Sequence, residues 1–548
     1  MTERSPSPDG EAIARKRPRS KARLGDVRIA AIDIGSNSIR QIVADVSHTG
    51  IIRVVDEMKA APRLGAGIQE TGRLSNHSMA AALAALSRMA ALARQLGAKR
   101  RRVVATSAVR EASNGAEWLA LVRKEAGMRI SVLDGNEEAR LSFLSALAHF
   151  DLASGRAVVV DIGGGSLELA LSADGLVERL ISLPFGAIRL TEKYFSKGIT
   201  PSAIKKLRRT VRKRLREEIS AKDWSGAQII GSGGTFTNLG GMVLARHGIQ
   251  TARTVHGTRV ARVELEHIVD TLAALSPAER LAVAGLNAGR ADIITAGLAV
   301  IAEVLAVFES KEVVVSGYGI REGILLELAR VIPKPADPGE ARERSVRELA
   351  ERSHFEEPHA RHVQKLALRL FDSIGARLGC AADERQLLAD AALLHDIGYH
   401  INYDKHHKHS YHLITHADLL GMTPVEQVAI ANIARYHRGS EPKRSHGNFG
   451  PLSAESRKRV TRLAALLRVA DGFDRGHAGA VEDIRVRWLA RAIRLIPVPS
   501  PKAGSIRLEL WGASKKSRLL SEYAGVPVEI VAPGGTTFTH EDDGTPAD

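Results

Sequence analysis

The chain has very little cysteine for its length, with Cys380 alone among 548 residues. A single cysteine cannot form an intramolecular disulfide, which excludes a disulfide-stabilised secreted scaffold and fits a reducing compartment. No apolar run approaches the ~20 residues of a membrane span, and the N-terminus lacks the apolar core of a secretory signal. We therefore predict no membrane association and a cytoplasmic location.

Nucleic-acid-binding motifs are also missing, although the chain carries a formal net charge of +16. No helix-turn-helix, RNP or zinc-finger pattern is found, so no nucleic-acid partner is expected. The excess of positive charge still indicates an anionic partner. A polyanionic phosphate substrate satisfies that requirement equally well.

Changes in composition and periodicity divide the chain into seven segments. Strands and helices alternate up to about residue 330, a Pro-rich stretch follows, and the next 140 or so residues are helical in pattern and rich in histidine. Beyond them, alternation at 484–488 and 506–510 predicts strands. The predicted segments are a disordered basic tail (1–26), lobe I (27–153), lobe II (154–332), a linker (333–345), an all-α domain (346–480), a small α+β cap (481–535) and a disordered tail (536–548).

The segment Asp-Ile-Gly-x-x-Ser occurs twice, at 33–38 and at 161–166. Each copy joins two apolar strands, predicted at 27–34 and 39–46 in the first half and at 157–161 and 167–171 in the second. The later elements also follow in the same order in both halves, which is typical of an internal duplication. We predict two similar α/β lobes with a cleft between them.

Four Gly/Ser/Thr turns lie at predicted strand ends, at 35–38, 106–107, 163–166 and 231–235. Such turns expose backbone N–H groups and hydroxyls that hold phosphate oxygens, and the helices that follow Thr106 and Thr235 direct their N-termini toward an anion. One turn is weak support, but four in equivalent places favour phosphate binding. The predicted phosphate ligands are Gly35, Ser36, Asn37, Ser38, Thr106, Ser107, Arg110, Gly163, Gly164, Gly165, Ser166, Gly233, Gly234 and Thr235.

Carboxylates gather at the same strand ends. Glu168 lies two residues beyond Ser166 on the outgoing strand, so both side chains point to one face. Asp33, Asp161 and Glu168 are predicted to hold a hard, oxygen-ligated cation, Mg²⁺ or Mn²⁺. Glu138 opens a helix directly after a strand, where a carboxylate is either a general base or a favourable first-turn charge.

Five motifs in order resemble the exopolyphosphatase/guanosine-pentaphosphate phosphohydrolase (Ppx/GppA) family: residues 33–38, Thr-Ser-Ala-Val-Arg at 106–110, Gly-Asn-Glu-Glu-Ala-Arg at 135–140, 161–168 and Gly-Ser-Gly-Gly-Thr at 231–235. The resemblance implies the duplicated actin/sugar-kinase/Hsp70-type (ribonuclease H-like) fold. It makes Glu138 the catalytic base and places Asp161 and Glu168 at the positions that organise metal and water. It also matches Arg110 and the turns to the family's phosphate contacts, and it is compatible with a homodimer.

The histidine-rich region contains an adjacent His395-Asp396 pair late in an apolar helix. With His362 and Asp471 this pair is a typical set of ligands for a divalent metal ion, and His409 and His437 are further candidates. Their order resembles the HD phosphohydrolase superfamily. The alternative is an HD-like scaffold that holds no metal.

The resemblance leaves the substrate open. The first interpretation is a metal-dependent exopolyphosphatase that removes terminal phosphate from inorganic polyphosphate. The alternative is removal of the 5′-terminal phosphate of guanosine pentaphosphate (pppGpp) at the same cleft. A third interpretation, from another class, is a regulator that binds phosphate or nucleotide without cleaving it, although Glu138 is present.

Overall fold

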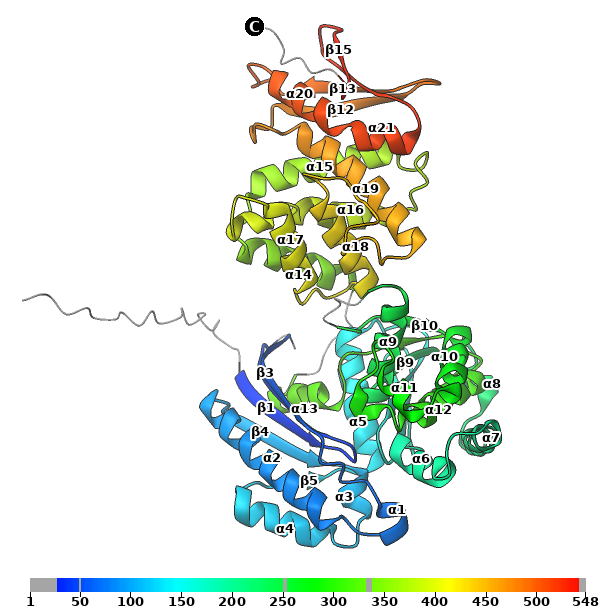
Figure 1. Ribbon diagram of the computed structural model, residues 1–548. Coiled ribbons are helices and arrows are strands. Elements are labelled where there is room, and N and C mark those ends of the chain that lie inside the picture. The colour runs from blue at the N-terminus through cyan, green and yellow to red at the C-terminus, as the bar shows by residue number, and fades with distance from the viewer. Residues whose placement is uncertain (1–26, 49–50, 250–253, 332–337, 542–548) are drawn as a thin grey trace, which may run out of the picture.

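The computed structural model describes residues 27–48, 51–249, 254–331 and 338–541. Two α/β lobes form the lower body in Figure 1, and a helical domain with a small cap extends from lobe II. The cap lies at the end farthest from the lobes. The mixed α/β fold class, the helical region and the terminal sheet are therefore as predicted.

Lobe I is built on a five-stranded sheet of order β3-β2-β1-β4-β5. β1 and β2 are antiparallel and joined by the first Asp-Ile-Gly-x-x-Ser turn, while β4 and β5 extend the sheet in parallel. The apolar runs of β1 and β2 are buried because helices cover the sheet. The strands are β1 (Val27–Ile34), β2 (Ile39–Val46), β3 (Ile52–Ala60), β4 (Arg100–Ala105) and β5 (Ser131–Val132).

Lobe II repeats this order with one added edge strand, as β8-β7-β6-β9-β11-β10. The second turn joins the antiparallel pair β6 and β7, and β9 pairs with β6 in parallel, as β4 does with β1. The sheet topology therefore confirms the predicted duplication. The strands are β6 (Arg156–Ile162), β7 (Leu167–Ala173), β8 (Leu176–Leu183), β9 (Gln228–Ser232), β10 (Arg259–Ala261) and β11 (Glu312–Val315).

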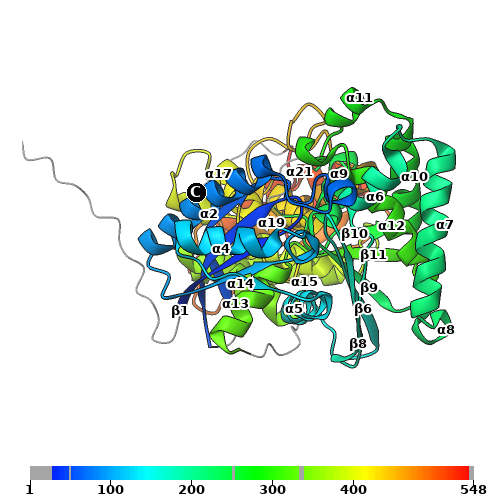
Figure 2. The same ribbon diagram turned by 90° about the horizontal axis from the view of Figure 1, so that it is seen from below.

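The two halves of the chain exchange helices. α5 (Gly135–His149) is the last helix of lobe I in sequence but packs Ala139, Phe143 and Ala146 on the lobe II strands. α13 (Ile320–Ala329) ends lobe II but packs Ile324 and Leu325 on β1 and β2 of lobe I. Figure 2 shows α5 and α13 beside each other between the lobes. Because each of these two helices packs on the sheet of the other half, together they hold the two sheets in a fixed orientation on either side of the cleft.

The remaining helices of the lobes lie on the outer faces of the sheets. α12 (Ile294–Val307) is buried apart from Ala306 and is almost wholly apolar, as expected of a helix enclosed by its neighbours. Its one charged residue, Glu303, is fully buried and forms ion pairs with Arg208 and Arg212 of α7. The helices are α1 (Ile68–Thr71), α2 (Asn76–Gln95), α3 (Ser107–Glu111), α4 (Gly115–Ala126), α6 (Ala187–Phe195), α7 (Pro201–Glu218), α8 (Ala221–Trp224), α9 (Gly234–Arg246), α10 (Arg262–Ala274), α11 (Pro277–Leu281), the 3₁₀ turn η1 (Ala288–Arg290) and α12 (Ile294–Val307).

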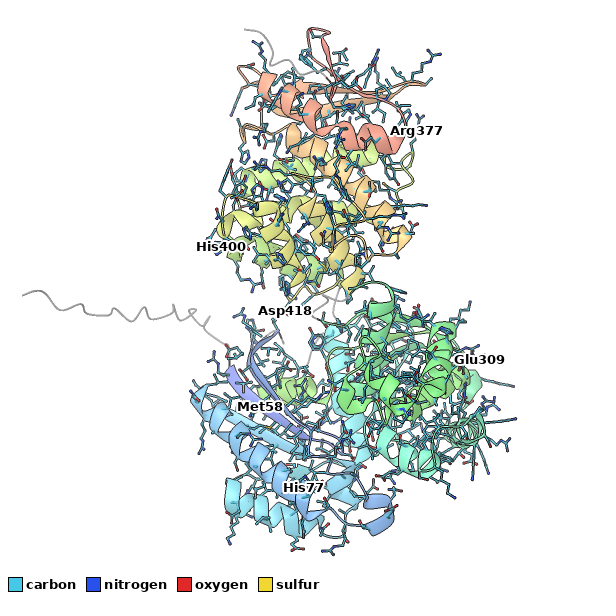
Figure 3. The ribbon with its side chains drawn as sticks, in the orientation of Figure 1. Met58, His77, Glu309, Arg377, His400 and Asp418 are labelled. Atoms are coloured by element: carbon cyan, nitrogen blue, oxygen red, sulfur yellow. The ribbon has the colours of Figure 1, made fainter. Side chains whose placement is uncertain are left out.

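The helical domain docks on lobe II. Leu244 and Ile249 of lobe II belong to the hydrophobic core of the helical domain, and Gly248 lies against the Pro451 carbonyl. Asp418 lies at the end of the domain that faces the lobes (Figure 3). The elements are α14 (Pro338–Arg352), α15 (Glu357–Ile374), α16 (Glu384–Leu394), η2 (Ile397–His400), α17 (His406–Thr415), α18 (Pro424–Arg435) and α19 (Ala454–Gly472).

The cap is a four-stranded sheet covered by two helices, and one predicted strand is wrong. Residues 506–510 are not extended, because α20 begins at Arg507. Leu510 is buried whereas Leu508 is 50% exposed. The residues that face the core are therefore Ile506 and Leu510, which are four positions apart, as on one face of a helix. The elements are β12 (Val481–Trp488), β13 (Ile493–Pro499), α20 (Arg507–Lys516), α21 (Arg518–Ala524), β14 (Val528–Val531) and β15 (Thr537–Phe538).

Some predicted segments lie partly or wholly outside the described residues. The predicted N-terminal tail (1–26) does so entirely, as do residues 332–337 of the predicted junction and 542–548 of the predicted C-terminal tail. Residues 338–345, assigned to the linker, form the first turns of α14, and Thr537–Phe538 pair with β14. Across the part of the chain that is described, every helix is too short or too polar to cross a bilayer.

Candidate active site

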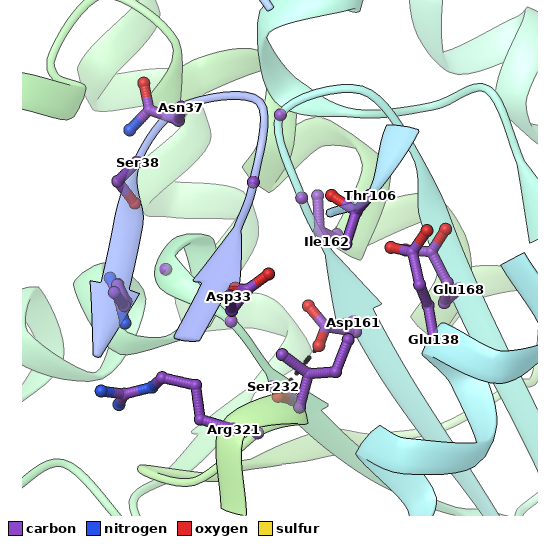
Figure 4. Close-up of a pocket in the computed structure, with 18 of the residues that line it drawn as sticks. Asp33, Asn37, Ser38, Thr106, Glu138, Asp161, Ile162, Glu168, Ser232 and Arg321 are labelled. Atoms are coloured by element: carbon purple, nitrogen blue, oxygen red, sulfur yellow. Dashed lines mark hydrogen bonds between the residues drawn. The ribbon is translucent and has the colours of Figure 1, made fainter. Parts of the chain in front are cut away.

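A cleft between the lobes collects nearly all of the residues predicted at the strand ends. The carboxyl ends of β1 and β6 face each other across it, and Asp33 and Asp161 point toward one another (Figure 4). Of the predicted cleft residues, only Arg110 and Thr235 do not line it. Those that do are Asp33, Gly35, Ser36, Asn37, Ser38, Thr106, Ser107, Glu138, Asp161, Gly163, Gly164, Gly165, Ser166, Glu168, Gly233 and Gly234.

The two Asp-Ile-Gly-x-x-Ser turns have the same backbone geometry. The Gly35 N–H donates to the Ser38 carbonyl at 3.1 Å, and the Gly163 N–H donates to the Ser166 carbonyl at 3.0 Å. The second turn is held from behind by Gly186, whose missing side chain lets it lie against the backbone of Gly164 and Gly165. The duplicated turns therefore present matching sets of backbone and hydroxyl groups from opposite walls of the cleft.

Two helices begin at the cleft. Thr106 is the N-cap of the short helix α3, and Gly233, with φ +91°, is the N-cap of α9. A side chain at Gly233 would overlap the Asp161 carboxylate, so glycine is required by both the backbone angle and the space. Thr235 lies one residue into α9 and is 1% exposed, packed toward Gly297. It supports the turn from behind the cleft wall.

The carboxylates are held by hydroxyl donors. The Asp161 Oδ2 atom accepts hydrogen bonds from Ser142 Oγ at 2.8 Å and from Ser232 Oγ at 3.3 Å. Glu168 Oε1 accepts one from Ser182 Oγ at 2.9 Å. These donors fix the direction of each carboxylate.

Burial raises the pKa of every carboxylate in this group, and repulsion from a neighbouring carboxylate adds to the rise for Asp33 and Glu168. Burial raises the pKa of Asp33 to about 7, and the charge of Asp161 adds to the rise. Burial also raises the pKa of Asp161, against its two serine hydrogen bonds. The pKa of Glu168 is raised well above its usual range, first by burial and then by Glu138. A bound cation would remove this repulsion.

Glu138 lies beside Glu168 in the cleft (Figure 4) and is 7% exposed. It is in the first turn of α5, whose N-cap Asp134 accepts a hydrogen bond from the Glu137 N–H. Arg110, predicted as a phosphate contact, instead donates to Glu138 Oε1 and to the Leu133 carbonyl, each at 2.5 Å. Burial raises the pKa of Glu138 to about 8 despite the opposing effect of Arg110. Such a perturbed, positioned carboxylate is typical of a general base.

Three arginines that were not predicted from the sequence also line the cleft: Arg40, Arg290 and Arg321. Burial lowers the pKa of Arg290 to about 10, with the Arg40 charge adding to the effect. A signal for Arg40 was present, because it lies two residues beyond Ser38, as Glu168 lies two beyond Ser166. Arg290 and Arg321 come from loop and helix positions with no motif, and local sequence gave no sign of them.

The predicted cleft ligands are of the type that a hard divalent cation prefers, because all of them are carboxylate oxygens. Asp33 Oδ1 is buried and accepts no hydrogen bond from the described residues. Among the described residues, however, Asp33, Asp161 and Glu168 do not form a group whose ligand atoms all lie within 4.8 Å of one another.

Contacts between the lobes close one side of the cleft. Arg63 of lobe I donates to Asp292 at 2.8 Å and to the Gly289 carbonyl at 2.9 Å. The Gly67 N–H donates to Glu192 Oε1 of lobe II at 2.9 Å. The two lobes are therefore bridged by side chains as well as by the crossed helices.

The candidate metal ligands of the helical domain are only partly as predicted. His395, Asp396, His437 and Asp471 lie in groups of close ligand atoms. The first histidine of these groups is His359, three residues before the predicted His362 on α15. Neither His362 nor His409 belongs to such a group among the described residues, so both are corrected as ligands of this cluster.

Comparisons with known proteins agree with this geometry. Residues 41–331 match the Ppx/GppA phosphatase family, and residues 341–494 match domain III of the Ppx/GppA phosphatases. An exopolyphosphatase from Cytophaga hutchinsonii is 25% identical, with a TM-score of 0.52 over 55% of this chain and 98% of its own. An exopolyphosphatase-like protein is 29% identical, with a TM-score of 0.51 over 56% of this chain and 98% of its own. The Aquifex aeolicus Ppx/GppA family member is 30% identical, with a TM-score of 0.48 over 56% of this chain and 98% of its own.

Proposed function

This chain belongs to the Ppx/GppA phosphatase family, and we propose that it is an exopolyphosphatase. It removes the terminal phosphate of inorganic polyphosphate by attack of water in the cleft between the lobes. The observation that carries the proposal is the lining of this cleft, in which paired phosphate-type turns and three arginines surround a group of buried carboxylates.

The residues divide the chemistry between them. Turn N–H groups, serine hydroxyls and arginines hold the non-bridging oxygens of the terminal phosphate and stabilise charge in the transition state. Water adds to the terminal phosphorus and Glu138 takes its proton. The bond from phosphorus to the bridging oxygen breaks, which releases phosphate and a polymer shorter by one unit.

The carboxylates of Asp33, Asp161 and Glu168 would hold Mg²⁺ or Mn²⁺ in the cleft. When bound, the ion neutralises phosphate charge and polarises the phosphorus–oxygen bonds. Arg110 is a positioning residue in this scheme, because it contacts Glu138 and orients its carboxylate toward the cleft.

The aromatic content of the cleft supports the polymer over a nucleotide. Tyr318 is the one aromatic residue among the described residues that line it. Its ring is stacked on His149, with centroids 3.7 Å apart, and packs edge-on against His256 at 4.8 Å. His149 thus covers one face of the ring, and no second aromatic side chain among the described lining residues is present to stack on a purine base, whereas a polyphosphate chain requires none.

The test measures phosphate release from long-chain polyphosphate and from pppGpp, with Mg²⁺, for wild type, Glu138→Gln and Glu137→Gln. Glu137 is the adjacent first-turn glutamate and does not line the cleft. We expect faster turnover of polyphosphate, a loss of about 10²–10⁴-fold in kcat for Glu138→Gln, and near wild-type activity for the control.

Release from pppGpp alone would assign the cleft to the nucleotide alternative. Binding of either compound without any release would identify a non-catalytic regulator. Undiminished polyphosphate hydrolysis in Glu138→Gln would remove Glu138 as the base while leaving the substrate assignment intact.

A further inference from the structure

One surface of the helical domain combines positive charge with exposed aromatic side chains. It is formed by residues 399–416, around η2 and α17, and by residues 435–446, which follow α18. We call this surface the α17 face. α17 lies at the left of the helical domain in Figure 1, and His400, at the end of η2, is labelled on the same side in Figure 3. Both segments are described in full, and neither lines the cleft between the lobes.

α17 supplies a stripe of basic side chains to this face. Lysines and histidines recur from its N-cap at i, i+3, i+4, i+7 and i+11, which is the spacing of one side of a helix. Asp404 is the single acidic residue in 399–416, and its carboxylate lies 3.6 Å from Lys405 Nζ. This side of α17 therefore carries an excess of positive charge. The stripe consists of Lys405, Lys408, His409, His412 and His416, none of which is buried.

The segment after α18 adds further cations. Glu441 is the single acidic residue in 435–446, and it is paired with Arg518 of α21 at 2.7 Å. The cations of the α17 face are therefore left without acidic partners. Those that form no ion pair with the described residues are Lys408, Arg435, Arg438 and Lys443.

The two segments bring like charges close together. The pKa of His446 is lowered first by partial burial and then by the charges of Arg435 and of two lysines, one from each segment. The pKa of His412 is lowered by burial, then by His416 and Arg435. The cations of the face thus repel one another, and an anion bound among them would relieve this repulsion.

Two tyrosine rings are exposed beside these cations. Tyr403 is 67% exposed and Tyr399 is 36% exposed, and their ring centroids lie 5.4 Å apart. The Arg438 guanidinium lies 5.9 Å from the centroid of the Tyr403 ring. Tyr399 is stacked on the buried His406 ring at 4.0 Å, which fixes its orientation. Exposed aromatic rings next to unpaired cations are the combination on which bases stack while phosphates pair.

We propose that the α17 face binds single-stranded nucleic acid, RNA or DNA. The bases stack on Tyr403 and Tyr399, and the phosphates pair with cations such as Arg438. Inorganic polyphosphate could use the cations but has no group to stack on a tyrosine, so the exposed rings favour a strand that carries bases.

This partner was not expected from the sequence, because no single segment contains a nucleic-acid-binding motif. The α17 face is assembled from two segments, and only the fold brings the tyrosines of one beside the arginines of the other. The proposal does not depend on the function proposed for the cleft.

The test measures binding of fluorescein-labelled oligo-U and oligo-dT of about 12 nucleotides to the full-length chain, by fluorescence anisotropy over a series of salt concentrations. The two oligomers distinguish RNA from DNA. The variants are Tyr403→Ala, Tyr403→Phe and Arg438→Gln. Lys365→Gln is the matched control, because it removes one exposed cation of the same domain that lies toward the cap, where Lys365 donates to the Glu482 carbonyl.

We expect Tyr403→Ala to weaken binding by about 5–100-fold and Tyr403→Phe to bind like wild type, because phenylalanine keeps the stacking ring. Arg438→Gln should weaken binding at low salt and reduce the slope of log affinity against log salt concentration by about 0.7, whereas Lys365→Gln should change neither. Unfolding temperatures check that each variant is folded. Wild-type affinity in Tyr403→Ala, or no binding by the wild type at low salt, would overturn the proposal.

Discussion

Replacement of Gly186 by alanine tests whether the second phosphate-type turn must be held in place from behind. Gly186 begins α6 with φ −72°, so alanine brings no backbone strain. Its β-carbon would, however, overlap backbone atoms of Gly164 and Gly165. Restoring ordinary contact of ~3.5 Å requires the turn to move by about 1 Å. A shift of that size in a phosphate-positioning group costs on the order of 10²-fold in kcat/KM.

The assay is steady-state phosphate release from polyphosphate, with Gly163→Ala as the control. A β-carbon at Gly163 meets only the Ser166 carbonyl, at an ordinary 3.7 Å. Gly163→Ala is expected to remain within a few-fold of wild type. If Gly186→Ala has wild-type kcat/KM and the same unfolding temperature, the turn tolerates displacement and the argument from close packing fails.

Two further predictions concern the helical domain. Glu384 is fully buried and accepts hydrogen bonds from Arg459 and Arg462. Glu384→Gln should cost about 3–5 kcal/mol in unfolding free energy because it removes the buried charge that pairs with Arg462, which is left with only the exposed Glu455 at 3.7 Å. The hydrogen bonds from these arginines outweigh burial and lower the pKa of Glu384. The loss of unfolding free energy in Glu384→Gln relative to wild type, measured by denaturant unfolding, should therefore have its full value above about pH 4.3 and should shrink as the pH falls below it. A loss that does not change with pH would contradict this reasoning. Gly248→Ala should separate the helical domain from lobe II, because the new β-carbon would overlap the Pro451 carbonyl, and the radius of gyration in X-ray scattering should increase. Gly97→Ala is the control, since Gly97 has the same φ of +76° but open space around it, and it should leave the radius unchanged. Equal radii for the two variants would show that the contact between Gly248 and Pro451 does not hold the helical domain in place.

The lobes could be predicted from the sequence because their signals are local. The strand, tight turn and strand around residues 33–38 and 161–166 are specified by neighbouring residues, and these two segments supply 11 of the residues that line the cleft. The exchange of α5 and α13 between the lobes could not be predicted in this way. Both helices have apolar faces, but only the three-dimensional arrangement decides which sheet each face covers.

The errors in the helical domain and the cap arise from ambiguous periodicity. His359 and His362 lie on one helix three residues apart, a spacing that puts both near the same face, and only the position of Asp396 decides between them. The run from Ile506 to Leu510 has apolar residues at i, i+2 and i+4, which fits a strand, but the i, i+4 pair also fits a helix. The exposure of Leu508 shows that the helical spacing prevailed.

The strands that flank the duplicated turns would allow one cleft to hold both an anionic substrate and a cation. β1 pairs Asp33 with Arg40 of β2, and β6 pairs Asp161 with Glu168 of β7 in the same register. Equivalent positions in the two lobes thus carry opposite charges. The carboxylate pair on lobe II is repulsive and favours a metal ion, whereas the Asp33–Arg40 pair on lobe I leaves an arginine available to phosphate. The difference between the two copies, rather than the repeat itself, would then draw a cation toward the lobe II carboxylates and phosphate toward Arg40.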